Sequence, residues 1–417
     1  MNTDTNVLII GGGITGLTAA VELSRMGRSA VVLERKPFVG GLCADFACKA
    51  TDKCAQCGLC LFSEALSEAR ECANVTFMPG SDLEHVERAD GKYVAKIVRR
   101  PPRVVQEKCT LCGECVKVCP VQPAAIGPTP PLVFPAGYAI DENRCIGVRG
   151  KKCTTCRTAC KQGAIREPLA PDRVSVTADS IIVAAGAETF DARKKAQFRL
   201  GSLKGVLTGL ELEKALQSSG ELKLPGLETP PKRLAFIQCV GSRDESLNHC
   251  YCSTVCCRYA IRMAHLLKTK MPALEVAIFY MDIQTSGKGF ADFFARHQKE
   301  FELIRSIPGK LVPDPNGGIL ASYDEVPSTK VIRRPFDAVV LSVGLCPPPQ
   351  LAQLAKVLKI NRNKAGFLDG SGADRVQTNA DGVFVAGTCE SPKDIVGSIA
   401  QAKTAAGAAT AYVKKLV

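Results

Sequence analysis

The chain has 417 residues and a formal net charge of +13, with 46% hydrophobic and 23% charged residues. This composition is typical of a folded globular protein and excludes a disordered tail or a fibre. No run of about 18 uncharged apolar residues occurs, which excludes a membrane-spanning helix of the usual kind.

Cysteine is the exceptional residue, with 21 in the chain, most of them two or three residues apart. Small secreted proteins use many cysteines for disulfides, but a chain of this length can build a large core without them. The first residues, MNTDTNVLIIGGG, lack the basic segment of a signal peptide. We therefore expect a cytoplasmic protein whose cysteines are mainly metal ligands.

The positive charge does not by itself indicate a nucleic-acid-binding protein. A four-iron cluster on four thiolates carries roughly −2, so several clusters and the phosphates of a dinucleotide would offset most of the charge. Basic residues are spread along the chain, with short runs only at 149–152 and 193–195. No zinc-finger, helix-turn-helix or RNA-binding signature is present. We expect the basic side chains to offset clusters and to contact acidic partner proteins.

A dinucleotide-binding fingerprint opens the chain. An apolar strand at 6–10 precedes Gly11-x-Gly13-x-x-Gly16, a helix over 17–26, and a second strand over 30–33 that leads to Glu34. In this pattern the glycines form a tight turn that admits a pyrophosphate, and the acid binds a ribose hydroxyl. The predicted cofactor contacts in this region are Gly11, Gly13, Ile14, Thr15, Gly16, Glu34, Arg35 and Gly41.

The first cysteine group follows the second strand. It consists of Cys43, Cys48, Cys54, Cys57 and Cys60. The last three have the spacing of three corners of a [4Fe-4S] cluster. Cys48 is the favoured fourth ligand and Cys43 the alternative, and zinc or free thiols are the competing interpretations.

The second cysteine group is typical of two-cluster ferredoxins. One half-motif is Cys109-x2-Cys112-x2-Cys115-x3-Cys119-Pro120, and the other has a lengthened first gap before Cys153-x2-Cys156-x3-Cys160. In such ferredoxins the fourth cysteine of each half binds the other cluster. One cluster is therefore predicted on Cys109, Cys112, Cys115 and Cys160, and a second on Cys119, Cys145, Cys153 and Cys156. Zinc ribbons do not use such triplets.

Two later segments favour a flavin. An apolar strand at 181–184 ends in Ala185-Gly186, and residues 378–388 resemble the second flavin motif of two-dinucleotide flavoproteins, with Thr388-Cys389-Glu390 where an acid usually stands. A last helix over about 397–413 would direct its N-terminus toward the flavin and favour a reduced, anionic ring. FAD is therefore the predicted cofactor, with further contacts from Ala185, Gly186, Gly387, Thr388 and Ile395.

The central segment departs from the nicotinamide-binding pattern. The strand at 232–237 leads into Gln238-Cys239-Val-Gly241-Ser-Arg243, which lacks the glycine triplet, so direct NAD(P) binding is not expected. A third cysteine group consists of Cys239, Cys250, Cys252, Cys256 and Cys257. Spacing alone leaves an iron–sulfur cluster and a redox disulfide equally open. The periodicity after Cys257 predicts that the adjacent pair begins a helix, whose dipole would lower the thiol pKa.

Several long segments carry a resemblance to a known family. They are QCVGSRDE (238–245), YCSTVCCRYA (251–260) and the stretches 278–289, 340–345 and 382–395. With the fingerprint and the ferredoxin-like segment, most of residues 5–412 resemble the A subunit of heterodisulfide reductase, which is the flavin subunit of anaerobic electron-transfer complexes. The resemblance implies that Cys239, Cys252, Cys256 and Cys257 hold an unusual four-iron cluster, which makes four [4Fe-4S] clusters in all. Archaeal members of the family carry further segments. Other subunits are therefore expected to supply the route by which electrons enter or leave through those segments.

The predicted fold is α/β, with mainly parallel sheets. It is a glutathione- or thioredoxin-reductase-like FAD-binding Rossmann domain with an inserted ferredoxin domain and a degenerate nucleotide-binding domain. The FAD domain is predicted over 1–100, including the first cysteine group, 171–228 and 346–417. The ferredoxin insert is predicted over 101–170 and the degenerate domain over 229–345. Five cysteines, 43, 72, 250, 346 and 389, are left as packing residues.

A flavin exchanges two electrons and each cluster one, so the predicted function is electron transfer within a multi-subunit oxidoreductase. The resemblance implies electron bifurcation, in which one electron goes uphill to ferredoxin. The alternatives are a non-bifurcating conduit in a quinone-interacting or class II benzoyl-CoA reductase complex, and an NAD(P)H-dependent disulfide reductase that uses Cys256 and Cys257. Lys393 is the predicted catalytic residue, stabilising negative charge near the flavin. The expected partners are heterodisulfide-reductase-like, ferredoxin, hydrogenase or dehydrogenase subunits, without nucleic acid or membrane span.

Overall fold

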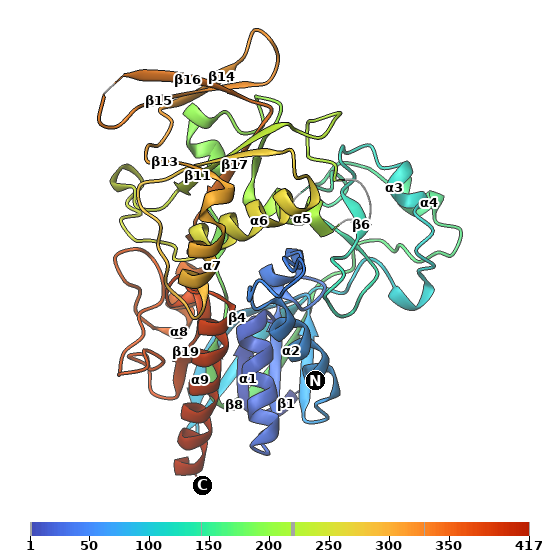
Figure 1. The fold of residues 1–417 in the computed structure, drawn as a ribbon. Coiled ribbons are helices and arrows are strands. Elements are labelled where there is room, and N and C mark those ends of the chain that lie inside the picture. Colours follow the sequence, from blue (N-terminus) through green and yellow to red (C-terminus); the bar gives the residue numbers. More distant parts are fainter. Residues whose placement is uncertain (1, 143, 218–221, 329, 417) are drawn as a thin grey trace.

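Two separate sheets divide the structure into two lobes, with a third, smaller lobe beside them (Figure 1). The computed structural model describes residues 2–142, 144–217, 222–328 and 330–416. The smaller lobe comes from the predicted ferredoxin insert. It contains the short helices α3 (Glu114–Lys117) and α4 (Thr155–Ala159) and the hairpin of β6 (Ile126–Pro128) and β7 (Tyr138–Ile140).

The larger sheet is built from both ends of the chain. Its strand order is β3-β2-β1-β8-β5-β4, and β19 pairs with the end of β8. Pairing is parallel among β1, β2, β3, β8 and β19, whereas β5 lies antiparallel to β8 and β4. The strands are β1 (Asn2–Ile10), β2 (Ala30–Glu34), β3 (Val75–Pro79), β4 (Ser81–Ala89), β5 (Lys92–Arg99), β8 (Asp172–Val183) and β19 (Val383–Val385).

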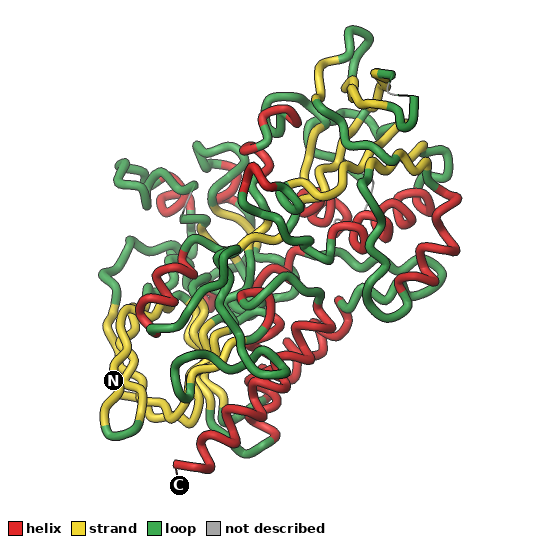
Figure 2. The backbone as a smooth tube through the Cα atoms, turned by 90° about the vertical axis from the view of Figure 1, so that its left-hand side faces the viewer, coloured by secondary structure: helices red, strands yellow, loops and turns green. Residues whose placement is uncertain are grey.

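Helices cover both faces of the larger sheet, because its central strands are apolar on both sides. Val7 and Ile9 pack against alanines of α1 (Ile14–Arg25) and α9 (Ile395–Leu416). Leu8 and Ile10 face α8 (Gln350–Leu358) on the other side. Figure 2 shows α9 running beside the strands to the C-terminus, and α2 (Leu59–Glu71) packs against α1.

The second sheet has five parallel strands in the order β10-β17-β11-β12-β13. Leu234 and Phe236 face the helices α5 (Gly209–Gln217), α6 (Cys256–Lys270) and α7 (Phe290–His297). The opposite face packs on an antiparallel sheet of three strands. The strands are β10 (Val206–Thr208), β11 (Arg233–Val240), β12 (Glu275–Phe279), β13 (Glu302–Ile304), β14 (Lys310–Pro313), β15 (Ile319–Asp324), β16 (Val331–Phe336) and β17 (Ala338–Val343).

The second lobe begins earlier in the chain than the sequence predicts. β10 and α5 lie with the five-stranded sheet, although the boundary of the degenerate domain was predicted at residue 229. The apolar run of β10 is too short to assign by periodicity, and only its parallel pairing with β17 places it. The lobes are also joined by a two-stranded pairing of β9 (Glu188–Thr189) with β18 (Leu345–Cys346). Within the described residues, no helix combines the length and apolarity needed to cross a bilayer.

Candidate functional site

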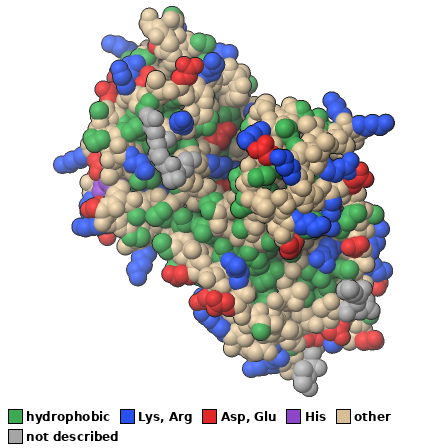
Figure 3. Space-filling model, turned by 90° about the vertical axis from the view of Figure 1, so that its right-hand side faces the viewer, with side chains coloured by type: hydrophobic (Ala, Val, Ile, Leu, Met, Phe, Trp, Pro, Cys, Tyr) green, Lys and Arg blue, Asp and Glu red, His purple; other side chains and the backbone are tan. Residues whose placement is uncertain are grey.

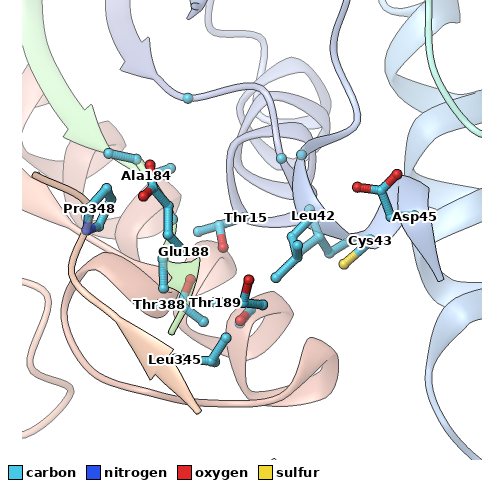
Figure 4. Close-up of a pocket in the computed structure, with 18 of the residues that line it drawn as sticks. Thr15, Leu42, Cys43, Asp45, Ala184, Glu188, Thr189, Leu345, Pro348 and Thr388 are labelled. Carbon is cyan, nitrogen blue, oxygen red and sulfur yellow. The ribbon is translucent and has the colours of Figure 1, made fainter. Parts of the chain in front are cut away.

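A cavity of about 850 Å³ lies between the two larger lobes. It opens where β1, β2 and β8 end, and the carboxyl ends of parallel strands are where α/β sheets usually bind ligands. Figure 4 shows Thr15, Cys43, Glu188 and Thr388, which come from distant segments of the chain, around this space. The volume is near the upper end of the usual range for ligand pockets, which suits an extended ligand such as a dinucleotide.

Most residues predicted to contact the cofactor line this cavity. They are Gly11, Gly13, Ile14, Thr15, Glu34, Arg35, Gly41, Ala185, Gly186, Thr388 and Ile395, together with the predicted catalytic Lys393. Gly16 and Gly387 lie behind the wall, where an added Cβ atom would come within 1.8 Å of the Gly11 oxygen and 2.1 Å of Thr15 Oγ1, respectively. These two glycines allow close packing around the cavity and do not line it.

The first and second glycines of the fingerprint differ in what constrains them. Gly11 has a φ of +114°, and a Cβ there would lie 2.2 Å from the Ala184 oxygen, so no side chain fits. A Cβ on Gly13 would meet only the Gly41 Cα, at an ordinary 3.6 Å. The fold therefore leaves room for a methyl group at Gly13. A ligand that approaches this backbone closely, such as a pyrophosphate, accounts for the absence of a side chain there.

The carboxylate of Glu34 holds the fingerprint loop in place. It accepts hydrogen bonds from the backbone N–H of Gly12 at 2.9 Å and of Lys36 at 2.8 Å. Burial raises the pKa of Glu34, and these two hydrogen bonds act in the opposite direction. The carboxylate lines the cavity and has further lone pairs, so it suits a ligand hydroxyl as predicted from the sequence.

A buried ion pair closes the cavity between the lobes. Lys49 Nζ lies 2.6 Å from a Glu213 oxygen, and the two side chains are only 4% and 6% exposed. Glu213 also accepts the N–H of Ala47 at 2.9 Å. Cys43 lines the cavity beside this pair, and burial raises the pKa of its thiol to about 12. Sequence reasoning missed the ion pair, because its members are far apart in the chain and neither belongs to a motif.

Lys393 lines the cavity, but its ammonium group already has protein acceptors. Nζ donates to the carbonyl oxygens of Gly387 at 2.8 Å and Ser391 at 2.9 Å and lies 3.0 Å from Glu390. Glu390 is 1% exposed and also binds Arg375 at 2.6 Å. This network shapes the turn before α9, and Glu390 is engaged there instead of lining the cavity. The catalytic role of Lys393 stays a prediction.

Two arginines of α6 were not anticipated as site residues, although both line the cavity. Arg262 is 3% exposed and donates to the oxygens of Ala55 at 2.6 Å and Gln56 at 3.2 Å. Burial lowers its pKa to about 10, so it remains charged at neutral pH. Arg258 pairs with Asp394 at the start of α9. Their spacing of four residues, directly after Cys256 and Cys257, was the available sequence signal.

The structure brings Cys48 to the triplet of the first cysteine group. Burial raises the pKa of the Cys60 thiol, and the neighbouring thiols of Cys48, Cys54 and Cys57 act in the same direction. Cys43 instead lies beside Lys49 and Glu213. Cys57 also lines the large cavity, so this group adjoins the predicted flavin site. All 21 cysteines are free thiols in the structure.

Most cysteines of the second group pack around the apolar core of the insert, and their division between two clusters stays a prediction. Cys119, Cys145, Cys153 and Cys156 line a second, small cavity in the insert. Burial raises the pKa of Cys115 to about 11, with contributions from the nearby thiols of Cys156, Cys109 and Cys112. Cys160, the fourth ligand predicted for the other cluster, packs in the same apolar core and accepts the N–H of Ala164 at 3.3 Å.

Four cysteines of the third group converge at the start of α6. Burial raises the pKa of Cys256 well above its usual value, and the thiols of Cys239, Cys257 and Cys252 act in the same direction. Cys239 lies within β11 where the strand register shifts between Ile237 and Val240, and its φ of 60° departs from the regular strand conformation. Cys250 is exposed. The adjacent pair begins α6, as predicted.

One more group of potential metal ligands was not predicted from the sequence. Glu300 accepts hydrogen bonds from Nδ1 of His265 at 2.8 Å and of His297 at 2.7 Å. Burial would raise the pKa of Glu300, but these two imidazoles hold it below the usual value. Each carboxylate oxygen already has a ring partner at hydrogen-bonding distance. The group is therefore explained as a hydrogen-bonded network between α6 and the end of α7.

Comparisons with known protein families identify two segments of the chain. A model described as an NAD(P)-binding Rossmann-like domain matches residues 9–71, and a model of a 4Fe-4S binding domain matches residues 102–123. Among solved structures, thioredoxin reductase from Lactococcus lactis has a TM-score of 0.54 at 16% identity, covering 99% of both chains. The enzyme from T. acidophilum has a TM-score of 0.53 at 15% identity with the same coverage. These likenesses confirm the predicted α/β fold.

Curated relatives match nearly the whole chain. The A subunit of the "H(2):CoB-CoM heterodisulfide,ferredoxin reductase" of Methanothermobacter marburgensis is 33% identical over 98% of this chain and 64% of the relative. The iron-sulfur A subunit of the "CoB--CoM heterodisulfide reductase" of Methanocaldococcus jannaschii has the same identity and coverage. A Methanosarcina acetivorans relative, the A subunit of "Ferredoxin:CoB-CoM heterodisulfide reductase", is 32% identical over 97% of this chain and 56% of the relative. The chain thus spans less than two thirds of the length of these relatives.

Substituting Gly13 with alanine should separate cofactor binding from folding. The methyl group fits the protein but occupies the backbone surface expected to face the pyrophosphate. We expect at least about tenfold weaker FAD binding, equal to about 1.4 kcal/mol, with an unchanged circular dichroism spectrum. The FAD-to-protein ratio is measured after anaerobic purification. Gly407→Ala in α9, where a Cβ meets nothing within 4 Å, is the matched control. Full flavin content in the Gly13 variant would contradict the assignment.

The buried ion pair should show strong coupling between its two members. Glu213→Leu leaves the Lys49 charge buried without its carboxylate, with the Ala47 carbonyl oxygen at 3.1 Å as an acceptor. Loss of the charged partner of a buried ion costs about 3–5 kcal/mol in comparable cases. The double variant Lys49→Met/Glu213→Leu should be more stable than Glu213→Leu alone, because no lone charge remains. Denaturant midpoints of the intact protein measure both. Removal of the exposed Lys214, 3.4 Å from Asp45, should cost less than about 1 kcal/mol. Additive losses in the double variant would rule out this coupling.

Proposed function

The chain belongs to the A-subunit family of heterodisulfide reductases, and we propose that it is the FAD- and iron–sulfur-containing electron-transfer subunit of a multi-subunit oxidoreductase. One observation carries the proposal. The cavity that fits a dinucleotide is lined by Cys57 of the first cysteine group and by Val255 and Arg258, which flank the Cys256–Cys257 pair. A flavin in this cavity would therefore lie between two candidate clusters, close enough for electron exchange with both.

We assign four [4Fe-4S] clusters to the cysteines. The sets are Cys48, Cys54, Cys57 and Cys60; Cys109, Cys112, Cys115 and Cys160; Cys119, Cys145, Cys153 and Cys156; and Cys239, Cys252, Cys256 and Cys257. Burial raises the pKa of at least one thiol in each of the four sets, and neighbouring thiols add to the effect. Iron binding relieves this crowding, because the metal takes up the thiolate charge.

FAD, when bound, supplies the two-electron exchange that divides into one-electron steps at the clusters. The chain's own residues bind and orient it. Gly11 and Gly13 provide the close backbone surface for the pyrophosphate, and Glu34 provides the acceptor for a ribose hydroxyl. The buried pair of Lys49 and Glu213 keeps water from the side between the lobes.

Direct reduction by NAD(P)H is not supported at the second lobe. Cys239 lies near the end of β11, and a Cβ added to Gly241 in the turn that follows would lie 2.0 Å from the ring of Phe190. A side chain therefore already occupies the space where a pyrophosphate would approach a nicotinamide-type turn. Electrons are proposed to arrive through other subunits of the complex.

The names of relatives that combine heterodisulfide and ferredoxin as substrates support a finer proposal, that the flavin divides electrons between two routes. Partner subunits of the heterodisulfide reductase, ferredoxin, hydrogenase or dehydrogenase type, in the cytoplasm, are proposed for these routes. A nucleic-acid partner is not supported. On the face shown in Figure 3, lysine and arginine side chains are scattered among acidic ones instead of forming one basic patch.

Iron, sulfide and flavin counts test the proposal. The anaerobically purified chain should contain about 16 irons, from four four-iron clusters, and one FAD. Cys57→Ala should remove about four irons, because a cluster loses one of its corners. Cys72→Ala is the matched control, since Cys72 lies outside the four sets and should leave the count unchanged. Zinc in place of iron, or an unchanged iron count in Cys57→Ala, would refute the assignment.

A redox titration of the bound flavin tests electron division. If the flavin divides electrons, the first one-electron loss makes the second easier, and an anaerobic titration followed by absorbance shows a single two-electron step. The N-terminus of α9, where Ile395 and Ser398 line the cavity, favours this by stabilising a fully reduced, anionic ring. Two resolved one-electron steps would instead identify a non-bifurcating conduit.

A further inference from the structure

The ferredoxin insert has two halves with the same backbone pattern. Val105 N–H donates to the Ala164 oxygen at 2.8 Å, and Asp141 N–H donates to the Ala125 oxygen, also at 2.8 Å. In both cases the accepting alanine in turn donates its own N–H to a cysteine sulfur, Cys160 at 3.3 Å and Cys119 at 3.4 Å. The two cluster sites are therefore framed by equivalent backbone segments, and any difference between them must come from side chains.

Arg103 breaks this equivalence. It directly precedes Val104, a core residue of the insert, and the equivalent position in the other half, before the core residue Ile140, is Ala139. Nε and Nη1 of Arg103 are buried and have no hydrogen-bond partner among the residues that the structure describes. Leaving a buried charged donor without an acceptor is costly, so such a group usually faces a ligand.

The guanidinium lies at one of the two cluster sites. Arg103 lines the small cavity whose wall also includes Cys119, Cys145, Cys153 and Cys156. Thiolate and inorganic sulfide are acceptors for N–H groups, so a cluster here would satisfy the orphaned donors.

The other cluster site has a different neighbour. Tyr138 packs with Cys109 and Cys115 in the apolar core of the insert, and its hydroxyl oxygen lies 3.7 Å from the position of a Cβ on Gly113, next to Cys112. The lysines near that set in sequence, Lys108, Lys117 and Lys161, are exposed, and Lys117 pairs with Glu114 at 2.6 Å. The two sites thus differ by a guanidinium whose Nε and Nη1 atoms are buried.

We propose that Arg103 donates hydrogen bonds to the cluster held by Cys119, Cys145, Cys153 and Cys156 and makes it the more easily reduced of the two clusters in the insert. Reduction adds one electron to the cluster, and a fixed positive charge in a poorly solvated site stabilises that added charge. An electron given up by the reduced flavin of this chain or by a ferredoxin-type partner then rests at this cluster. The inference rests on the cluster assignments of the proposed function.

Potentials measured on the full chain by electron paramagnetic resonance test the inference. Arg103→Gln should shift one cluster of the insert to a lower reduction potential and leave the other unchanged, and Arg103→Lys should give a smaller shift because the charge is kept. Arg149→Gln, an exposed arginine of the same insert, is the matched control and should shift neither. Equal shifts of both clusters, or no shift in Arg103→Gln, would overturn the inference.

Two variants that each keep only one of the two insert clusters identify which of these clusters responds. Arg103→Gln should lower the remaining potential in a Cys112→Ala chain and have no effect in a Cys153→Ala chain, and the reverse result would overturn the inference. Wild-type chain labelled with ¹⁵N-arginine provides a measurement that does not depend on variant stability. A guanidinium nitrogen should couple magnetically to the reduced cluster, and absence of coupling counts against the hydrogen bonds. If neither cysteine variant loses iron, the cluster assignments themselves fail, which is a distinct outcome.

Discussion

The buried guanidinium of Arg262 is the contact on which the arrangement of this protein depends. It sits in α6 of the second lobe and donates to Ala55 and Gln56 in the cysteine loop of the first lobe. Its charge also lies 4.9 Å and 5.6 Å from the ring centres of Phe290 and Phe293. A buried cation is stable only where acceptors are supplied, so the loop must remain against α6. This contact holds the first and third cysteine groups on either side of one cavity.

The ferredoxin insert is joined to the predicted FAD-binding domain between two neighbouring strands, so it does not interrupt the larger sheet. It connects β5 and β8, which are neighbouring antiparallel strands, so the ends of the insert are held close together as in a long hairpin. The insert also returns to the cofactor site, where Val39 and Phe134 exchange backbone hydrogen bonds of 2.8 and 3.2 Å. A Cβ on Gly40 would lie 2.9 Å from the Leu132 oxygen, so this glycine permits the approach. The insert is therefore joined to the larger sheet through β5 and β8 and also packs against the loop that contains Val39 and Gly40.

Local patterns predicted much of the site, and long-range contacts account for what they missed. The fingerprint predicted β1, α1, β2 and the glycines at the cavity, because these depend on neighbours in sequence. The surroundings of Lys393 and Glu390 were harder to predict. Glu390 pairs with Arg375, and Lys393 donates to the Gly387 oxygen in the turn before α9. Lys49, Glu213 and Arg262 carry no motif. They are important because they are buried between the lobes, and an unpaired buried charge is strongly destabilising.

By itself the sequence determined the spacing of the cysteine triplets, the nucleotide-binding turn and the helix that begins at Cys256, since each depends on residues within one or two turns of chain. Only the tertiary structure places Cys48, Cys54 and Cys57 near the Cys60 thiol, and Cys43 beside Lys49 and Glu213. It also decided that β10 belongs to the second sheet and that Arg103 lines the small cavity together with Cys119, Cys145, Cys153 and Cys156. These outcomes depend on which distant segments of the chain pack together in the interior. Residue spacing does not distinguish these arrangements, whereas burying a charge or an unpaired donor costs free energy and so favours some of them over others.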